Sequence, residues 1–196
     1  MIPLEVIKNF VEAKITPREF ERLLHENQEL IAVLEGDFSL PSYIEESDLY
    51  TFVIGQNYSN IEHVFNVQVL LSDFLKENSV KHERNKRYEE LFNVVLKVQP
   101  KWLNISFDYL SNLVNSAPLL NGKELQAWIK EEIKNEFRCL KSPPKWLQAP
   151  CWPLEDGKPL IFVGQLDAGD LMHDTSCVYV FFNPANNTFS TLTQSC

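Results

Sequence analysis

The chain has 196 residues, of which 44% are hydrophobic, so it can bury a core without disulfides or bound metal. Its formal net charge of −9 disfavours a general role in binding nucleic-acid phosphates. No apolar run approaches the ~18 residues of a membrane span, and the first residues lack the pattern of an export signal. We therefore expect a cytoplasmic protein with no membrane partner and with reduced thiols at its four cysteines.

The first two-thirds of the chain shows helical periodicity. A helix is predicted from Pro3 to about Lys14. Thr16 and Glu19 form a capping-box pattern for a second helix that ends near Gly36, with Asn27 as a candidate position for a break. A Pro- and Ser-containing loop follows, and Ser47 or Asp48 is expected to cap the next helical turns. Later apolar stripes predict helices over about 60–76, 88–98, 107–114 and 121–140.

After Pro143 the chain changes character. The stretches PLIFVGQL, CVYVFFN and TFSTLTQ are rich in β-branched and aromatic residues and are separated by turn residues, which indicates strands. NPANN between the last two is typical of a hairpin loop. The prediction is an α+β fold with about seven helices and then a small antiparallel sheet. We expect a helical domain over 1–142 and a β-rich subdomain over 143–196 packed on it.

The tetrapeptide PKWL occurs twice, ending at Leu103 and Leu147. Each copy follows a predicted helix, where Pro prevents continuation and the Trp can pack over the apolar face. The sequences on either side of the copies differ, which argues against a duplicated domain. We expect Trp102 and Trp146 to be buried or half-buried anchors, the alternative being a binding hot spot.

Residues for catalysis are not evident. His25 lies in a HENQE stretch that lacks the second His of a helical zinc motif, and His173 and Cys177 have no second pair to complete a four-ligand site. G-x-S-x-G and Gly-rich phosphate loops are absent. The basic stretch 81–87 lacks interleaved aromatics, so we expect it to be exposed to water and not to contact nucleic acid. The sequence predicts no enzyme, no cofactor and no metal.

Two stretches resemble known families. FVEAKITPREFERLLHENQEL, with DLYTFVIGQNY and VQVLLSDFL, resembles bacterial colicin-like immunity proteins of the kind that also serves in contact-dependent growth inhibition. APCWPLEDGKPLIFVGQLDAGDL, with VYVFFN, is similar to the uncharacterised YwqG-like family, and Trp152, Gly157, Phe162, Gln165 and Asp167 are among the matching residues. The first resemblance implies a toxin antidote, and the second implies a β-rich fold.

The immunity resemblance implies that the chain binds a cognate bacterial toxin domain. The toxin is expected to be a cationic nuclease, such as an RNase or tRNase, whose active site or substrate approach is occluded. Acidic side chains speed such an encounter and aromatic anchors supply affinity. The first-choice contact surface is the acidic loop and helix start, and an acidic cluster in the β-rich part is the second choice. The partner-binding candidates are Asp37, Tyr43, Glu45, Glu46 and Asp48, followed by Asp167, Asp170 and Asp174.

A different class of function stays open. The β-rich part could form a pocket for a small ligand or substrate, with Gln165, Asp167 and His173 as its polar groups. A third reading is a scaffold or regulatory binder unrelated to toxins that uses the same acidic surface.

Overall fold

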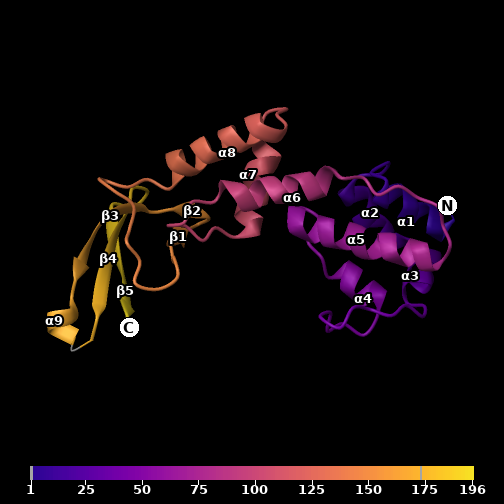
Figure 1. The fold of residues 1–196 in the computed structure, drawn as a ribbon, viewed down its shortest axis with the longest axis horizontal. Coiled ribbons are helices and arrows are strands. Elements are labelled where there is room, and N and C mark those ends of the chain that lie inside the picture. The colour runs from indigo at the N-terminus through magenta and orange to yellow at the C-terminus, as the bar shows by residue number, and fades with distance from the viewer. Residues whose placement is uncertain (1, 173) are drawn as a thin grey trace. The chain divides into compact units, whose positions relative to one another are not determined.

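The computed structural model describes residues 2–172 and 174–196, and the fold is α+β (Figure 1). The chain forms two compact units. The first, here called the helical unit, comprises the residues up to Val95 together with Phe107–Ser116. The second, here called the mixed unit, comprises Leu96–Ser106 and Ala117–Cys196. Each unit is described by itself below.

Eight helices of the described chain precede the sheet, and a short ninth lies between two strands. They are α1 (Pro3–Val11), α2 (Pro17–Glu26), α3 (Gln28–Leu34), α4 (Leu49–Ile54), α5 (Ile61–Glu77), α6 (Arg87–Val98), α7 (Phe107–Ser116), α8 (Gly122–Glu136) and α9 (Gly169–Met172).

Side-chain caps define the first helix boundaries. Thr16 Oγ1 accepts from the Glu19 backbone N–H at 3.2 Å, and the Glu19 carboxylate accepts from the Thr16 N–H at 2.8 Å, so the predicted capping box is present. Asn27 ends α2, and its Oδ1 accepts the Leu30 N–H at 3.2 Å at the start of α3. The candidate break at Asn27 is therefore confirmed. Because it divides one predicted helix into α2 and α3, eight helices precede the sheet in the described chain, whereas about seven were predicted.

The core of the helical unit forms around stacked aromatic rings. The rings of Phe10 and Phe20 stack with centroids 4.1 Å apart, and Tyr58 meets both edge-on. The Tyr58 hydroxyl donates to the Val53 carbonyl at 3.0 Å, and burial raises the pKa of this phenol far above its usual range. Val64, with the other buried apolar residues of α5, completes a core that needs no cross-link.

Helix α7 is joined to α5 by polar contacts at the start of α5. The Asp108 carboxylate accepts from the Asn60 side-chain amide at 2.7 Å, and Ser111 Oγ accepts the Ile61 backbone N–H at 2.9 Å. The rings of Phe65, Phe92 and Phe107 stack in series at 5.1 and 5.3 Å. These contacts explain why α7 belongs to the helical unit although residues 96–106 precede it in the chain.

The mixed unit contains α8 and two antiparallel sheets. A small hairpin of β1 (Leu154–Glu155) and β2 (Lys158–Pro159) turns at Asp156 and Gly157, both with positive φ, as a tight Asp-Gly turn requires. The larger sheet has the order β3 (Ile161–Asp167), β4 (Ser176–Asn183), β5 (Thr188–Ser195). The β4–β5 register runs from Ser176 opposite Ser195 to Asn183 opposite Thr188, which confirms the predicted hairpin at NPANN.

One face of the larger sheet is covered by tryptophans. Trp152 is buried against Phe162 and Phe181, with centroid distances of 6.1 and 5.4 Å. Trp146 packs on Tyr179 at 4.6 Å. Aromatic rings therefore join the segment before β1 to the sheet, together with hydrogen bonds such as that from the Tyr179 hydroxyl to the Lys145 carbonyl at 3.1 Å.

The two PKWL copies contact each other. Trp146 Nε1 donates to the backbone carbonyl of Trp102 at 2.8 Å, and the Trp102 ring lies 5.6 Å from that of Trp152. Both Trp102 and Trp146 are half-buried, so their predicted role as anchors is confirmed. The two copies of the tetrapeptide are thus structural segments that contact each other within the mixed unit.

Two expected boundaries differ from the structure. The helix predicted over 121–140 ends at Glu136, because the backbone of Arg138–Leu140 turns away to bond with Phe162 of β3. The compact units also do not follow the predicted domain division, since residues 142 and 143 both lie inside the mixed unit. Helix α8 belongs to the same unit as the sheet, and Phe137, directly after its end, meets the ring of Trp152 at 5.6 Å.

The indole-to-carbonyl bond between the PKWL copies is expected to stabilise the mixed unit. Trp146→Phe keeps an aromatic ring but removes the Nε1–H donor, so the free energy of unfolding should fall by about 1 kcal/mol. Urea unfolding followed by circular dichroism measures this change. Trp128→Phe is the matched control, because Trp128 on α8 is also half-buried and its indole makes no hydrogen bond to another described residue. An equal loss in both variants would contradict the assigned role of the bond.

Candidate partner-binding surface

The loop between α3 and α4 is held by its apolar residues and exposes its polar ones. Phe38, Leu40 and Ile44 pack against the core of the helical unit, and the Phe38 ring meets Phe74 of α5 edge-on at 5.4 Å. Asp37, with the other charged residues of the loop before Asp48, is exposed. The anchored apolar side chains therefore give the loop a fixed path while its acids face water.

Tyr43 is the outstanding exposed side chain of this loop. Its exposed fraction is 80%, although a Tyr ring is usually at least half covered in a folded protein. A turn in which the Ile44 N–H donates to the Pro41 carbonyl at 2.9 Å places the ring outward. An aromatic ring presented in this way is a favourable anchor for a partner.

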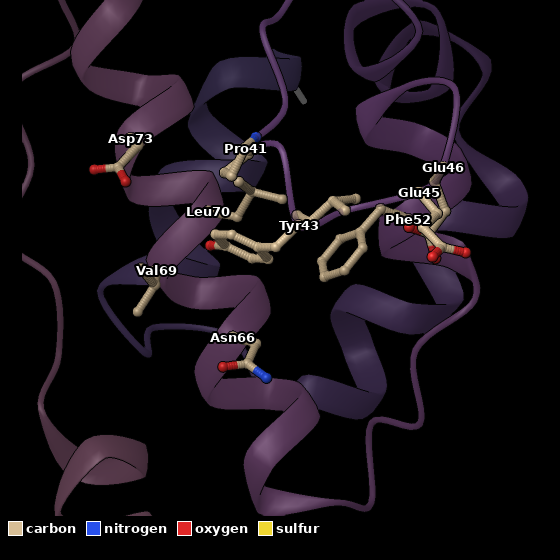
Figure 2. A pocket seen from close by; sticks show the side chains of 10 residues that line it. Pro41, Tyr43, Glu45, Glu46, Phe52, Asn66, Val69, Leu70 and Asp73 are labelled. Atoms are coloured by element: carbon tan, nitrogen blue, oxygen red, sulfur yellow. The ribbon is translucent and has the colours of Figure 1, made fainter.

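A groove of about 450 Å³ lies beside Tyr43 within the helical unit (Figure 2). Its walls come from the loop, from α4 and from one face of α5. The lining residues are Pro41, Tyr43, Ile44, Glu45, Glu46, Phe52, Asn66, Val69, Leu70 and Asp73.

The groove combines an apolar centre with acidic ends. In the view of Figure 2, Asp73 lies on one side of the Tyr43 and Phe52 rings, and Glu45 and Glu46 lie on the other. Asp73 is paired with Lys76 at 2.7 Å. Within the part of the chain that the structure describes, Glu45 and Glu46 form no ion pair, so their negative charge faces an incoming partner without a local cation.

Asp48, a predicted partner-binding residue, is also the helix cap, for which the sequence left Ser47 and Asp48 as alternatives. Its carboxylate accepts from Ser47 Oγ at 2.6 Å and from the Thr51 backbone N–H at 2.7 Å, which makes it the N-cap of α4. The hydrogen bond from Ser47, followed by those from Thr51, lowers the pKa of this carboxyl. Asp48 therefore positions the groove wall that carries Phe52.

The second acidic cluster lies in the mixed unit. Asp167, Asp170 and Asp174 line one open hollow together with Gly169 and Thr175, so the structure brings the three predicted aspartates together. The Asp167 carboxylate accepts the Gly169 backbone N–H at 3.0 Å and thereby holds the turn into α9. This hollow has no aromatic wall, unlike the groove beside Tyr43.

The net charge is confined to the helical unit. That unit contains 18 acidic and nine basic side chains, a balance of −9, whereas the mixed unit contains nine of each. A cationic partner is therefore attracted to the helical unit over the longer range, and to the aspartate hollow only locally.

Two of the polar groups proposed for a ligand pocket in the β-rich part, Gln165 and Asp167, have other partners. Gln165 accepts the Lys145 backbone N–H at 2.7 Å and donates to the Lys145 carbonyl at 3.2 Å, so both ends of its amide hold the segment before β1. His173 lies outside the described residues. Across residues 2–172 and 174–196, no three His, Cys, Asp or Glu side chains are placed to hold a metal ion.

Several groove residues were missed by sequence reasoning. Asn66, Val69, Leu70 and Asp73 recur at i, i+3, i+4 and i+7, which is a second stripe on α5 that meets the buried one at Leu70. Two neighbouring stripes of partly apolar residues on one helix were the sequence signal that could have indicated this groove wall.

Comparison with models of protein families, with curated proteins and with solved structures finds no match to this chain. The resemblances to immunity proteins and to the YwqG-like family therefore stay predictions. Among the described helices, none combines the length and the apolar character that a membrane crossing requires.

The Asp48 cap predicts a pH dependence of stability. Because the pKa of Asp48 is lower in the folded than in the unfolded chain, its stabilising effect is complete above the unfolded value of about 3.9 and is lost as the pH falls through the folded value. Asp48→Asn keeps a capping oxygen but cannot titrate, so its stability relative to the parent chain should rise in acid. Urea unfolding at about pH 7 and about pH 3 measures this difference.

Asp48→Ala is the matched comparison, because it removes the cap at every pH. We expect it to cost about 1 kcal/mol near neutral pH, where Asp48→Asn costs little. A stability difference between Asp48→Asn and the parent chain that does not change with pH would contradict the cap assignment.

Proposed function

We propose that this protein is an immunity protein that binds a cognate bacterial toxin domain, a cationic nuclease, and blocks its active site or the approach of its substrate. One observation supports this proposal most directly. The helical unit, which holds the whole net charge, has an open groove lined by the exposed Tyr43 and by Glu45 and Glu46, which form no ion pair with another described residue. Binding of this kind requires no catalytic residue of its own.

The chemistry of the groove fits a partner side chain that is both long and cationic. The apolar stem of a Lys or Arg can lie against Phe52 and Leu70, while its head reaches Glu45 and Glu46. The face of Tyr43 offers a further attraction to a cation. A nuclease active site presents such cations, because it must attract the phosphates of its own substrate.

The mode of inhibition follows from this chemistry. Carboxylates that occupy the phosphate-binding cations of a nuclease compete directly with the nucleic acid. Charge attraction accelerates the encounter, and the aromatic contacts slow dissociation.

The decisive experiment is protection of cells that express the toxin domain encoded next to this gene. We expect survival only when this protein is present, and co-purification of the two proteins as a stoichiometric complex. Equal survival with and without the protein, or failure to form a complex at micromolar concentration, would overturn the proposal.

Charge reversal tests the docking surface. Glu45→Lys with Glu46→Lys should lower the association rate about tenfold at low salt, because the two side chains would repel a cationic toxin. Surface plasmon resonance at several salt concentrations measures the rate. Glu29→Lys with Glu35→Lys is the matched control, since both residues are exposed acids of the same unit outside the groove. Asp170→Lys with Asp174→Lys tests the second-choice surface.

Truncation of the anchor gives a separate readout. Tyr43→Ala should accelerate dissociation by about 30-fold, corresponding to a hot-spot loss of about 2 kcal/mol, with little change in the association rate. Because Tyr43 is exposed, the stability of the free protein should stay within about 0.5 kcal/mol of the parent. If only the Asp170 and Asp174 variant weakens binding, the toxin docks on the aspartate hollow instead.

A further inference from the structure

The strands β4 and β5 contain no charged residue. Their sequences are SCVYVFFN and TFSTLTQS. Strands at the edge of a sheet usually carry a Lys, a Pro or another device that discourages pairing with a further strand. β5 is an edge strand of eight residues and has none of these devices.

The two edges of the larger sheet differ. On the β3 side, the Phe162 N–H donates to the Arg138 carbonyl at 2.9 Å, and the Leu140 N–H donates to the Phe162 carbonyl at 2.8 Å. A segment of the chain therefore covers part of that edge. Over the described residues, β5 pairs only with β4. In an antiparallel ladder half of the backbone groups of an edge strand point outward. At the C-terminal end of β5 the Ser195 carbonyl accepts from Gln148 Nε2 at 2.7 Å, and the edge before it presents donors and acceptors to an extended strand.

Side chains along this edge are also accessible. Thr188 through Thr191 are exposed, and Phe189 has an exposed fraction of 66% while contacting Phe182 at 5.1 Å. The register places Phe182 and Phe189 on the sheet face opposite the tryptophans. A strand added beside β5 would cover part of this apolar surface.

We infer that the free edge of β5 pairs with β5 of a second copy of this chain, which joins the two larger sheets into one antiparallel sheet. Side-chain chemistry selects this occupant. In any register of self-pairing, only Thr, Phe, Ser, Leu and Gln oppose one another, so the joined edge brings no like charges together, and the net charge of −9 that each copy carries lies on its helical unit. A cationic partner finds no carboxylate on β4 or β5 and is drawn to the helical unit instead.

This inference is independent of the proposed function and has its own test. Sedimentation equilibrium of the full chain, from roughly 1 μM to 1 mM, should show a monomer–dimer equilibrium. Thr191→Lys with Thr193→Lys places like charges on the paired edge and should weaken dimerisation at least tenfold. Asn135→Lys with Ser142→Lys adds the same charge to exposed positions of the mixed unit and should leave the dimer unchanged.

Hydrogen–deuterium exchange of the unmodified chain gives a second measurement that does not depend on how the variants fold. Amides of residues 188–195 should exchange more slowly at high than at low protein concentration, while those of α8 should not change. A chain that stays monomeric over the whole range, a dimer that survives the two edge lysines, or a dimer without added protection in β5 would each overturn the inference.

Discussion

The anchoring of the loop between α3 and α4 is the constraint on which the functional argument depends. Carboxylates on a mobile loop would pay the entropy of ordering each time a partner binds. Here Phe38 packs edge-on against Phe74, and Ile44 is half-buried against the core of the helical unit. Tyr43, Glu45 and Glu46 are therefore displayed from a loop that the apolar side chains have already ordered.

The separation of charge follows from how the two units gain their stability. The helical unit buries apolar stripes of α1 and α5 and leaves the opposite helix faces to carboxylates. The mixed unit has a shorter helical portion and relies on aromatic contacts around Trp152, with balanced charge outside. One polypeptide thus carries a strongly acidic surface and an uncharged sheet edge, and these suit partners of different chemistry.

Much of the fold could be predicted from local sequence signals. The capping box at Thr16, the strand chemistry after Pro143 and the NPANN hairpin each depend on a few neighbouring residues, and all three predictions are confirmed. The end of α8 could not be predicted, because it depends on backbone pairing between Cys139 and Phe162, 23 positions apart. The Asp156-Gly157 turn, in contrast, depends on local sequence, because an Asp-Gly dipeptide favours a tight hairpin turn.

The candidate site was predictable only in part. An acidic loop with one Tyr stands out in the sequence, whereas its partner wall on α5 is visible only once the loop has been placed against Asn66 and Leu70. The capping role of Asp48 was expected, but its hydrogen bond from Ser47 depends on side-chain geometry. Which helices belong to which compact unit likewise depends on tertiary contacts. Composition alone could not show that α8 belongs to the same unit as the sheet.

The discontinuous course of the chain has a practical consequence for dissecting the molecule. The polypeptide leaves the helical unit after Val95, returns for Phe107–Ser116 and leaves again. A fragment that ends at Val95 would lack Asp108 and Ser111, and with them the partners of Asn60 and of the Ile61 N–H at the start of α5. During synthesis the helical unit cannot be complete until α7 has emerged. Residues 96–106 are made before α7, so they lack their contacts in the mixed unit until the chain from Ala117 onward has been synthesised.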